Sequence, residues 1–119
     1  MVGAGGFLGA IVRYTVSGWC ARIFGAHFPA GTFVVNFLGS FFLALVITIM
    51  VERTLITSSW RLFWAIGFLG AFTTFSTFAW ETMALMKEGS MFLALFNVAG
   101  NITFCLIAVK LGMILAEIS

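Results

Sequence analysis

Four long apolar segments, separated by short polar connectors, constrain the fold of this chain more than any other feature of its sequence. They run approximately over residues 2–24, 32–51, 60–86 and 91–116. Each is near or above the roughly 20 residues that a transmembrane helix needs. Lipid admits only helices or closed barrels, and these runs lack the alternation of barrel strands. The chain is therefore predicted to be an all-α integral membrane protein, with four transmembrane helices in a single domain over residues 1–119.

The scarcity of charge excludes several other classes of protein. Only 8% of the 119 residues are charged, against about 25% in typical soluble domains, so a soluble enzyme is excluded. A disordered chain is excluded as well, because the sequence holds 15 Phe and 4 Trp. Its six basic residues are scattered, so we expect no nucleic-acid partner. Since no paired acid and base, activated nucleophile or metal cluster is present, we expect no enzyme.

The basic residues give little preference for one orientation in the membrane. With four spans, the termini and the middle connector share one side, which holds Arg53 and Arg61, with Lys110 able to reach it from within the last span. The other side holds Arg22 and Lys87. A clear topology needs a clear excess of Lys and Arg on one side. The near balance favours insertion in both orientations, and hence an antiparallel dual-topology homodimer whose two copies form an inverted repeat.

Small residues in the first span are spaced for close contact between helices. Gly5 and Gly9 form a GxxxG pair, and Gly6 and Ala10 have the same interval. This spacing is typical of membrane helix dimers, but glycine is also common in membrane helices generally. The face is therefore either a dimer contact or an ordinary glycine-rich stretch.

Two polar residues stand out in the first two spans. Arg13 lies a third to halfway along the first span, where a central arginine costs about 2.5–3.5 kcal/mol and should face protein or water. It could bind or attract an anion, or it could snorkel and brace the fold. Asn36 shares a helix face with Ser40. Its amide could replace water around a small anion, or form an interhelical hydrogen bond.

The third span carries the densest polar signal, in the string GFLGAFTTFSTFAWE over residues 67–81. Two glycines and four hydroxyl residues weaken the regularity of a membrane helix here. A break would free carbonyls, which suit a cation, and amides, which suit an anion. Phe75 and Phe78 share a face, and the positive edges of their rings could coordinate an anion. Packing in the core or against lipid is the alternative for both rings.

The fourth span carries a polar stripe. Asn97, Asn101 and Cys105 follow one another at intervals of four residues on one face, which can line a hydrated track or join helices. Glu81, at the end of the third span, is either a buried partner for a hydroxyl or an arginine, or a boundary charge.

Three strings of this sequence together resemble the signatures of the Fluc/CrcB family of fluoride channels. They are GGFLGAIVRY (5–14), PAGTFVVN (29–36) and GFLGAFTTFSTF (67–78). The resemblance covers almost the whole chain. It implies a fluoride-selective ion channel in the inner (plasma) membrane of a bacterium, which passively exports cytoplasmic fluoride and so protects the cell. It also implies a broken third helix and an antiparallel dual-topology homodimer with two pores.

The resemblance further implies an anion pathway along Asn36, Phe75, Ser76, Thr77, Phe78, Asn97 and Asn101. Asn36 would be the pore-facing asparagine, and the two phenylalanines would turn their ring edges to the ions. The hydroxyls of Ser76 and Thr77 could contribute to the pathway. Asn97 and Asn101, with Cys105, would occupy the polar track of the fourth helix.

Two further roles follow from the resemblance alone. Arg13 would lie near the pore entrance, as a vestibule or structural residue. A structural sodium ion would lie at the dimer centre, held by the backbone carbonyls of Gly70 and Thr73.

Two other functions fit a small membrane protein of this length. A small multidrug-resistance-type proton-coupled exporter is the main alternative, but it needs a carboxylate in the first membrane helix. That helix has Arg13 and no acid. A scaffold subunit without transport activity would explain the hydrophobicity but would leave Asn36, Arg13 and the string TTFSTF without a role.

Overall fold

The computed structural model describes residues 1–25, 27–53 and 58–118, and within these ranges the regular structure is entirely helical. In chain order the elements are α1 (Val2–Phe24), α2 (Ala30–Arg53), α3 (Ser58–Arg61), the π-helix η1 (Leu62–Leu69), α4 (Gly70–Phe72), α5 (Ser76–Lys87) and α6 (Met91–Ile118). The predicted all-α class is confirmed. The orientation argument used the Arg53 side chain and a connector that includes residues 54–57, and both lie outside the described part of the chain.

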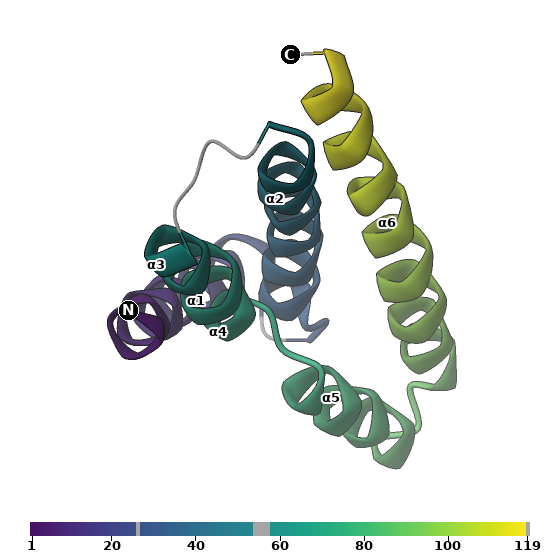
Figure 1. The fold of residues 1–119 in the computed structure, drawn as a ribbon. Helices are drawn as coiled ribbons and strands as arrows, with labels where there is room; N and C mark the ends of the chain where they lie inside the picture. The colour runs from purple at the N-terminus through teal and green to yellow at the C-terminus, as the bar shows by residue number, and fades with distance from the viewer. Residues whose placement is uncertain (26, 54–57, 119) are drawn as a thin grey trace.

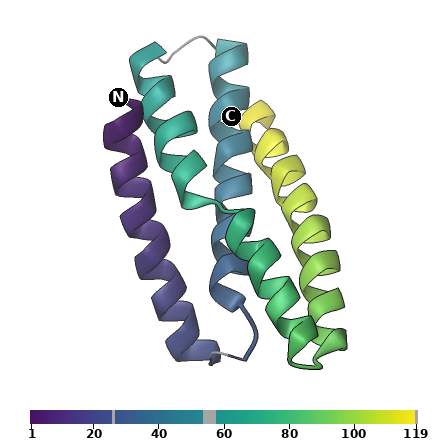
Figure 2. The same ribbon diagram turned by 90° about the horizontal axis from the view of Figure 1, so that it is seen from below.

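The long segments pack side by side and alternate in direction along the chain (Figures 1 and 2). Helix α2 packs mainly along α6, whereas α1 packs along η1 and α4. Helix α5 is displaced sideways from α4 and contacts α6 (Figure 1). Both termini lie toward the end of the molecule at which α2 finishes and α3 begins (Figure 2). This arrangement brings the start of α5 close to the facing sides of α2 and α6.

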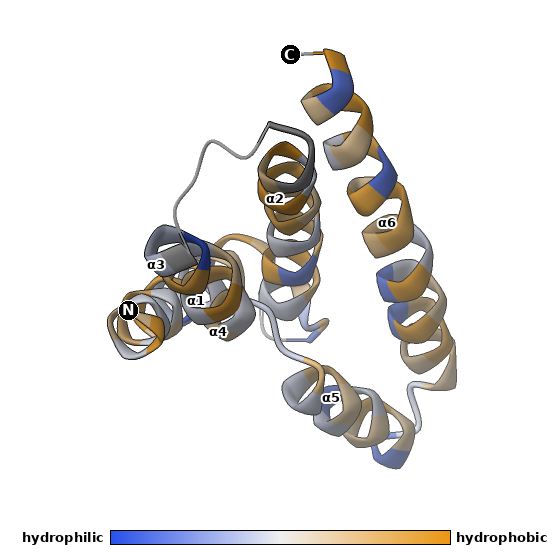
Figure 3. Ribbon diagram, in the orientation of Figure 1, coloured by the Kyte–Doolittle hydropathy of each residue, from blue (hydrophilic) through white to orange (hydrophobic). Residues whose placement is uncertain are grey.

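Among the residues that the structure describes, three helical stretches are long and apolar enough to cross a membrane, namely Ala30–Met50, Ser59–Lys87 and Met91–Ile118. Apolar residues cover most of α2 and α6, where hydrophilic ones interrupt them at a few positions, whereas α5 is paler and more mixed (Figure 3). Helix α1 has the bounds expected from the sequence, but its glycines, Arg13 and Arg22 make it less apolar than the others. The structure thus shows three candidate membrane helices.

The turn between α5 and α6 depends on a glycine. Gly89 has φ 89°, a left-handed conformation that side chains with a Cβ rarely adopt. The Ser90 amide donates to the Leu85 carbonyl at 2.9 Å, and the Gly89 amide donates to the Met86 carbonyl at 3.1 Å. These are the two hydrogen bonds of a Schellman motif, which satisfy carbonyls at a helix end. The turn lets α6 begin at once and return beside α5.

The glycine face of α1 packs inside the chain. A Cβ at Gly5 would overlap the carbonyl oxygen of Phe63, and a Cβ at Gly9 would overlap that of Phe68. Both glycines are buried. The face that could have been a dimer contact is therefore occupied by η1 of the same chain, because only residues without a Cβ let the two backbones approach so closely.

We expect Gly9→Ala to destabilise the protein by about 1–3 kcal/mol, because the added methyl group forces α1 away from η1. Gly18→Ala is the matched control, since it lies on the same helix and a Cβ there would meet nothing within 4 Å. Thermal unfolding in detergent, followed by the loss of monodisperse protein, compares the two variants. Equal transition temperatures would contradict the packing argument.

Candidate functional site

The candidate site lies where the chain leaves α4 and enters α5. Helix α4 ends at Phe72, Thr73 is extended with φ −87° and ψ 157°, and α5 begins at Ser76. This interruption falls in the string that was expected to weaken the helix, inside the Ser59–Lys87 candidate span. Each interrupted turn leaves backbone amides and carbonyls without their usual partners. Those groups determine how the site is built.

Asn36 of α2 replaces the missing partners of Thr74. Its Nδ2 donates to the Thr74 carbonyl oxygen at 3.0 Å, and the Thr74 amide donates to Asn36 Oδ1 at 2.8 Å. One side-chain amide thus satisfies both backbone groups of a residue outside regular structure, as a neighbouring strand would. The pair fixes the interruption against α2.

Hydroxyl groups satisfy further backbone atoms on both sides of the interruption. Thr73 donates to the Leu69 carbonyl through its amide and through Oγ1, each at 3.2 Å. Thr74 Oγ1 accepts a hydrogen bond from the Thr77 amide at 3.3 Å, and so gives a partner to one of the free amides in the first turn of α5. The two threonines thereby end α4 and begin α5.

Arg13 of α1 also serves the interruption. Its Nε donates to the Ala71 carbonyl oxygen at 3.0 Å. In a continuous α-helix that carbonyl would accept from the amide of Phe75. The bracing interpretation of Arg13 therefore has a specific contact, and the residue is absent from the wall of the cavity described next.

Carbonyl oxygens of the described interruption remain available, among them those of Gly70, Phe72 and Thr73. Among the described residues, no backbone amide outside the helices and no side chain donates a hydrogen bond to Gly70 O or Thr73 O. These are the two residues to which the family resemblance assigns a sodium ion. Uncharged carbonyl oxygens are suitable ligands for a hard cation, so the groups present fit such an ion.

A cavity of about 280 Å³ opens beside the interruption. Polar and aromatic side chains from α2, α5, α6 and the interruption itself form its wall, namely Asn36, Ser40, Thr73, Thr74, Phe75, Phe78, Asn101, Ile102 and Cys105. None of these residues is charged. The cavity therefore offers neutral hydrogen-bonding groups and ring edges.

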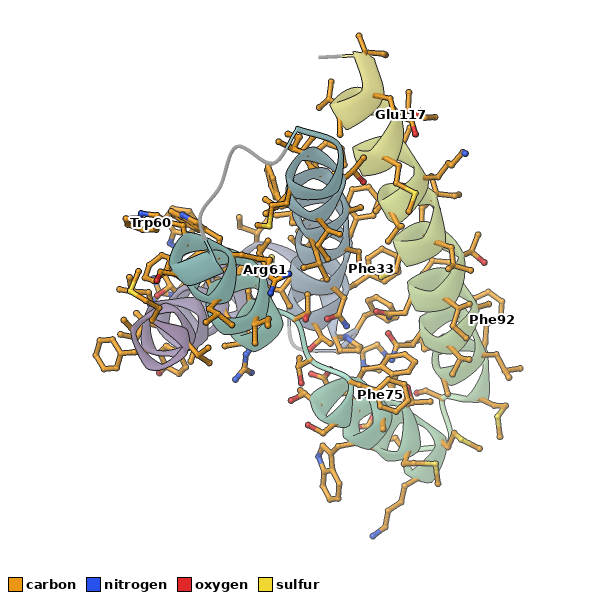
Figure 4. The ribbon with its side chains drawn as sticks, in the orientation of Figure 1. Phe33, Trp60, Arg61, Phe75, Phe92 and Glu117 are labelled. Atoms are coloured by element: carbon orange, nitrogen blue, oxygen red, sulfur yellow. The ribbon has the colours of Figure 1, made fainter. Side chains whose placement is uncertain are left out.

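The two phenylalanines of the cavity differ strongly in burial. Their ring centroids are 5.5 Å apart and their planes make an angle of 52°. Phe78 is 8% exposed, but Phe75 is 77% exposed. Figure 4 shows Phe75 at the start of α5, on the side of that helix near α2 and α6. The wall around Phe75 is therefore incomplete in a single chain.

Buried asparagines extend the polar site away from the cavity. Asn36 Nδ2 donates to Asn101 Oδ1 at 3.4 Å, and Asn101 Nδ2 donates to Asn97 Oδ1 at 2.9 Å. Asn97 is fully buried, and its Nδ2 donates to Thr82 Oγ1 at 2.9 Å. The Thr82 hydroxyl donates to the Phe78 carbonyl at 2.9 Å. These bonds join α2, α6 and α5 around the cavity.

The structure brings together four of the seven residues of the expected anion pathway, since Asn36, Phe75, Phe78 and Asn101 all line the cavity. The other three, Ser76, Thr77 and Asn97, are absent from its wall. Ser76 is exposed, and Asn97 lies behind Asn101 in the hydrogen-bonded chain.

Sequence reasoning missed Thr82. Its only signal was the interval of four residues from Phe78, which places both on one face of α5. Nothing in that interval indicated that α6 would supply an asparagine opposite it.

Glu81 lies at a second cavity, of about 230 Å³, where α1 ends and α2 begins. Ser17 and Thr32 are part of the same wall, and Glu81 Oε1 is buried without a hydrogen-bond partner among the described residues. The carboxyl group is thus placed with hydroxyl groups inside the protein rather than as a boundary charge.

The chain matches the family model described as CrcB-like protein, Camphor Resistance (CrcB), over residues 1–113. It is 42% identical over 116 residues to Fluoride-specific ion channel FluC 1 of Methanosarcina acetivorans, covering 98% of this chain and 88% of that protein. It is 41% identical over 112 residues to Fluoride-specific ion channel FluC of Geotalea uraniireducens, covering 94% and 90%. A relative of the same name from Clostridium perfringens is 40% identical over 118 residues, with 99% and 92% covered.

We expect Asn36→Leu to destabilise the fold by about 1–3 kcal/mol, because it leaves the amide and carbonyl of Thr74 without partners. Ser40→Ala, one turn along the same helix face, removes a polar group from the same cavity without touching the interruption. Thermal unfolding of the purified proteins in detergent compares the two substitutions. A loss for Asn36→Leu no larger than that for Ser40→Ala would show that Asn36 does not hold the interruption in place.

Proposed function

The chain belongs to the CrcB-like family, and we propose that it forms a fluoride-selective ion channel through which cytoplasmic fluoride leaves the cell passively. The observation that carries this proposal is the uncharged cavity at the interruption, lined by amides, hydroxyls and phenylalanine rings. Relatives named fluoride-specific ion channels support it over nearly the whole chain. Passive export would protect the cell from the toxicity of the ion.

The chemistry of the cavity suits a small, strongly hydrated anion. Fluoride leaves water only if several hydrogen bonds replace those of its hydration shell. Neutral donors such as the Asn36 amide and the Ser40 hydroxyl can do this without holding the ion too tightly to leave. The positive edges of the Phe75 and Phe78 rings add further favourable contacts.

A second copy of the chain would complete the site. Irregular backbone does not face lipid within a membrane, yet Ser76 and most of Phe75 are exposed beside the interruption. An inverted copy in an antiparallel dual-topology homodimer would cover these groups and give two pores. In this arrangement α1 spans the membrane in addition to the three candidate membrane helices, which gives four spans. Ser59–Lys87 is then a single span that is broken at Thr73.

A sodium ion is part of this proposal. The free carbonyl oxygens of Gly70 and Thr73 would hold it at the centre of the dimer. There the positive charge would neutralise oxygen dipoles that lipid cannot satisfy.

The protein is not an enzyme, because the relatives of this family are ion channels. It is a multi-pass membrane protein, and its relatives come from both bacteria and archaea, so a bacterial host remains a prediction. Nothing observed favours a proton-coupled exporter, since α1 contains no acidic residue.

Liposomes that contain the purified protein should lose fluoride rapidly and retain chloride, because the cavity donors match the smaller ion. Efflux is measured with a fluoride electrode and, in parallel, with a chloride electrode. Phe75→Ile and Phe78→Ile should each reduce fluoride efflux strongly while the dimer still assembles, because aliphatic side chains lack the positive ring edge.

Protein-free liposomes and the matched conservative variant Ile102→Leu in the cavity wall serve as references for these rates. Absence of fluoride loss from well-folded dimers would overturn the channel proposal and point to proton-coupled transport. Normal flux through both phenylalanine variants would remove only the proposed role of the rings.

Replacing sodium by a large organic cation during purification should weaken the dimer and lower fluoride efflux, because the carbonyl oxygens of Gly70 and Thr73 would then hold no cation. Dimer content is followed by size-exclusion chromatography and efflux by the fluoride electrode. Potassium at equal ionic strength controls for screening. Indifference of both properties to the cation would contradict the sodium site.

A further inference from the structure

We propose that Asn101 acts as a resident hydrogen-bond acceptor for the Asn36 amide and does not bind the anion itself. The proposal rests on the proposed function, since it concerns how the Asn36 donor is held between the passage of successive fluoride ions. Its basis is the direction of the hydrogen bonds that run from α2 through α6 to α5.

The backbone of Thr74 fixes this direction at one end. An amide N–H can only donate and a carbonyl can only accept, so Asn36 must turn Oδ1 to the Thr74 amide and Nδ2 to its carbonyl. The remaining hydrogen on Asn36 Nδ2 then points toward Asn101. Asn101 therefore has to present its oxygen, and not its NH₂ group, to Asn36.

The backbone of Phe78 fixes the same direction at the other end. Asn101 Nδ2 donates both to the Asn97 carbonyl and to Asn97 Oδ1, each at 2.9 Å, which uses both of its hydrogens. Asn97 Nδ2 donates to Thr82, whose single hydroxyl proton goes to the Phe78 carbonyl. Reversing either asparagine would bring two donors or two acceptors together.

Asn101 consequently presents its side-chain oxygen, and not its NH₂ group, on the side where Asn36 would bind an anion. Its oxygen carries partial negative charge and competes with fluoride for one N–H of Asn36. Three hydrogen bonds between side chains connect Asn36 to Thr82 through Asn101 and Asn97. The one between Asn36 and Asn101 is the longest, at 3.4 Å, and the other two measure 2.9 Å. It is therefore the weakest link, which an arriving ion displaces and a departing ion restores.

Because Asn101 already accepts from the Asn36 amide, each arriving fluoride ion must first replace that hydrogen bond. The Asn36 amide therefore binds fluoride less tightly than it would without Asn101 as acceptor. Weak binding favours rapid release, which conduction requires. Thr82 is a positioning residue in this scheme. It lies outside the cavity wall, and its oxygen accepts from Asn97 Nδ2 and so keeps Asn97 Oδ1 turned toward Asn101 Nδ2.

The test is the fluoride dependence of efflux from liposomes that contain the Asn101→Leu variant. Removing the acceptor should lower the half-saturating fluoride concentration about fivefold, the equivalent of one hydrogen bond, and lower the maximal rate as release slows. Thr82→Val should cause a smaller change in the same direction, because Asn97 then loses the partner of its Nδ2 and holds the Asn101 amide less firmly in place. The initial rate is measured with a fluoride electrode over a series of internal fluoride concentrations.

Thr15→Val is the matched control for Thr82→Val. It also removes a hydroxyl that bonds the carbonyl four residues earlier, but on the exposed side of α1, and it should change neither parameter. A half-saturating concentration that rises in Asn101→Leu would show direct binding of the anion and overturn the proposal. An unchanged half-saturating concentration with a lower maximal rate would also overturn it, because that pattern reports only lost folded protein.

Two results separate this proposal from the proposed function. If the unsubstituted protein conducts no fluoride, the channel function itself fails. If Asn101→Leu yields no folded protein, Thr82→Val decides, and an unchanged half-saturating concentration in that variant overturns the acceptor role.

Discussion

Backbone groups released inside an apolar helix must find partners within the protein, because lipid supplies none. The pair of hydrogen bonds between Asn36 and Thr74 meets this demand at the least regular point of the chain. Around it, Arg13 satisfies the Ala71 carbonyl and Thr73 satisfies that of Leu69. Side chains from two other helices thus stabilise an interruption that would otherwise be costly, and the cavity beside it exists because the interruption is held open.

The same physical reasoning explains why the site is polar but uncharged. An ionised group in a membrane needs an ion of opposite charge or water, whereas an amide can pair with another amide. The chain places asparagines on α2 and α6 where their groups satisfy one another, so that donors are present without a permanent charge. Glycines on α1 make a different contribution, because they let η1 approach and bring Arg13 within reach of the interruption.

The sequence predicted the helical class, the bounds of α1 and the string in which the helix loses its regularity. Hydrophobic length and turn-forming residues carry that information locally. The local sequence does not show which element packs against a helix face. For this reason the face formed by Gly5 and Gly9 could not be assigned to η1 rather than to a second chain. The interval between Asn97 and Asn101 placed both on one side of α6 but gave neither the orientation of their amides nor the role of Thr82. Those depend on backbone atoms of Thr74 and Phe78, which only the packed structure brings near.

The order in which the helices emerge during synthesis has a consequence for the hydrogen-bonded chain of asparagines. Helix α2 and the interruption emerge from the ribosome before α6, so Asn36 and Thr74 can meet before Asn97 and Asn101 have emerged. Thr74 can already pair with Asn36 at that stage, but the Nδ2 hydrogen that points away from the interruption has no acceptor. When α6 inserts, Asn101 supplies the acceptor for this hydrogen. A chain without α6 would therefore leave this Asn36 hydrogen without an acceptor in the apolar membrane, which is energetically costly.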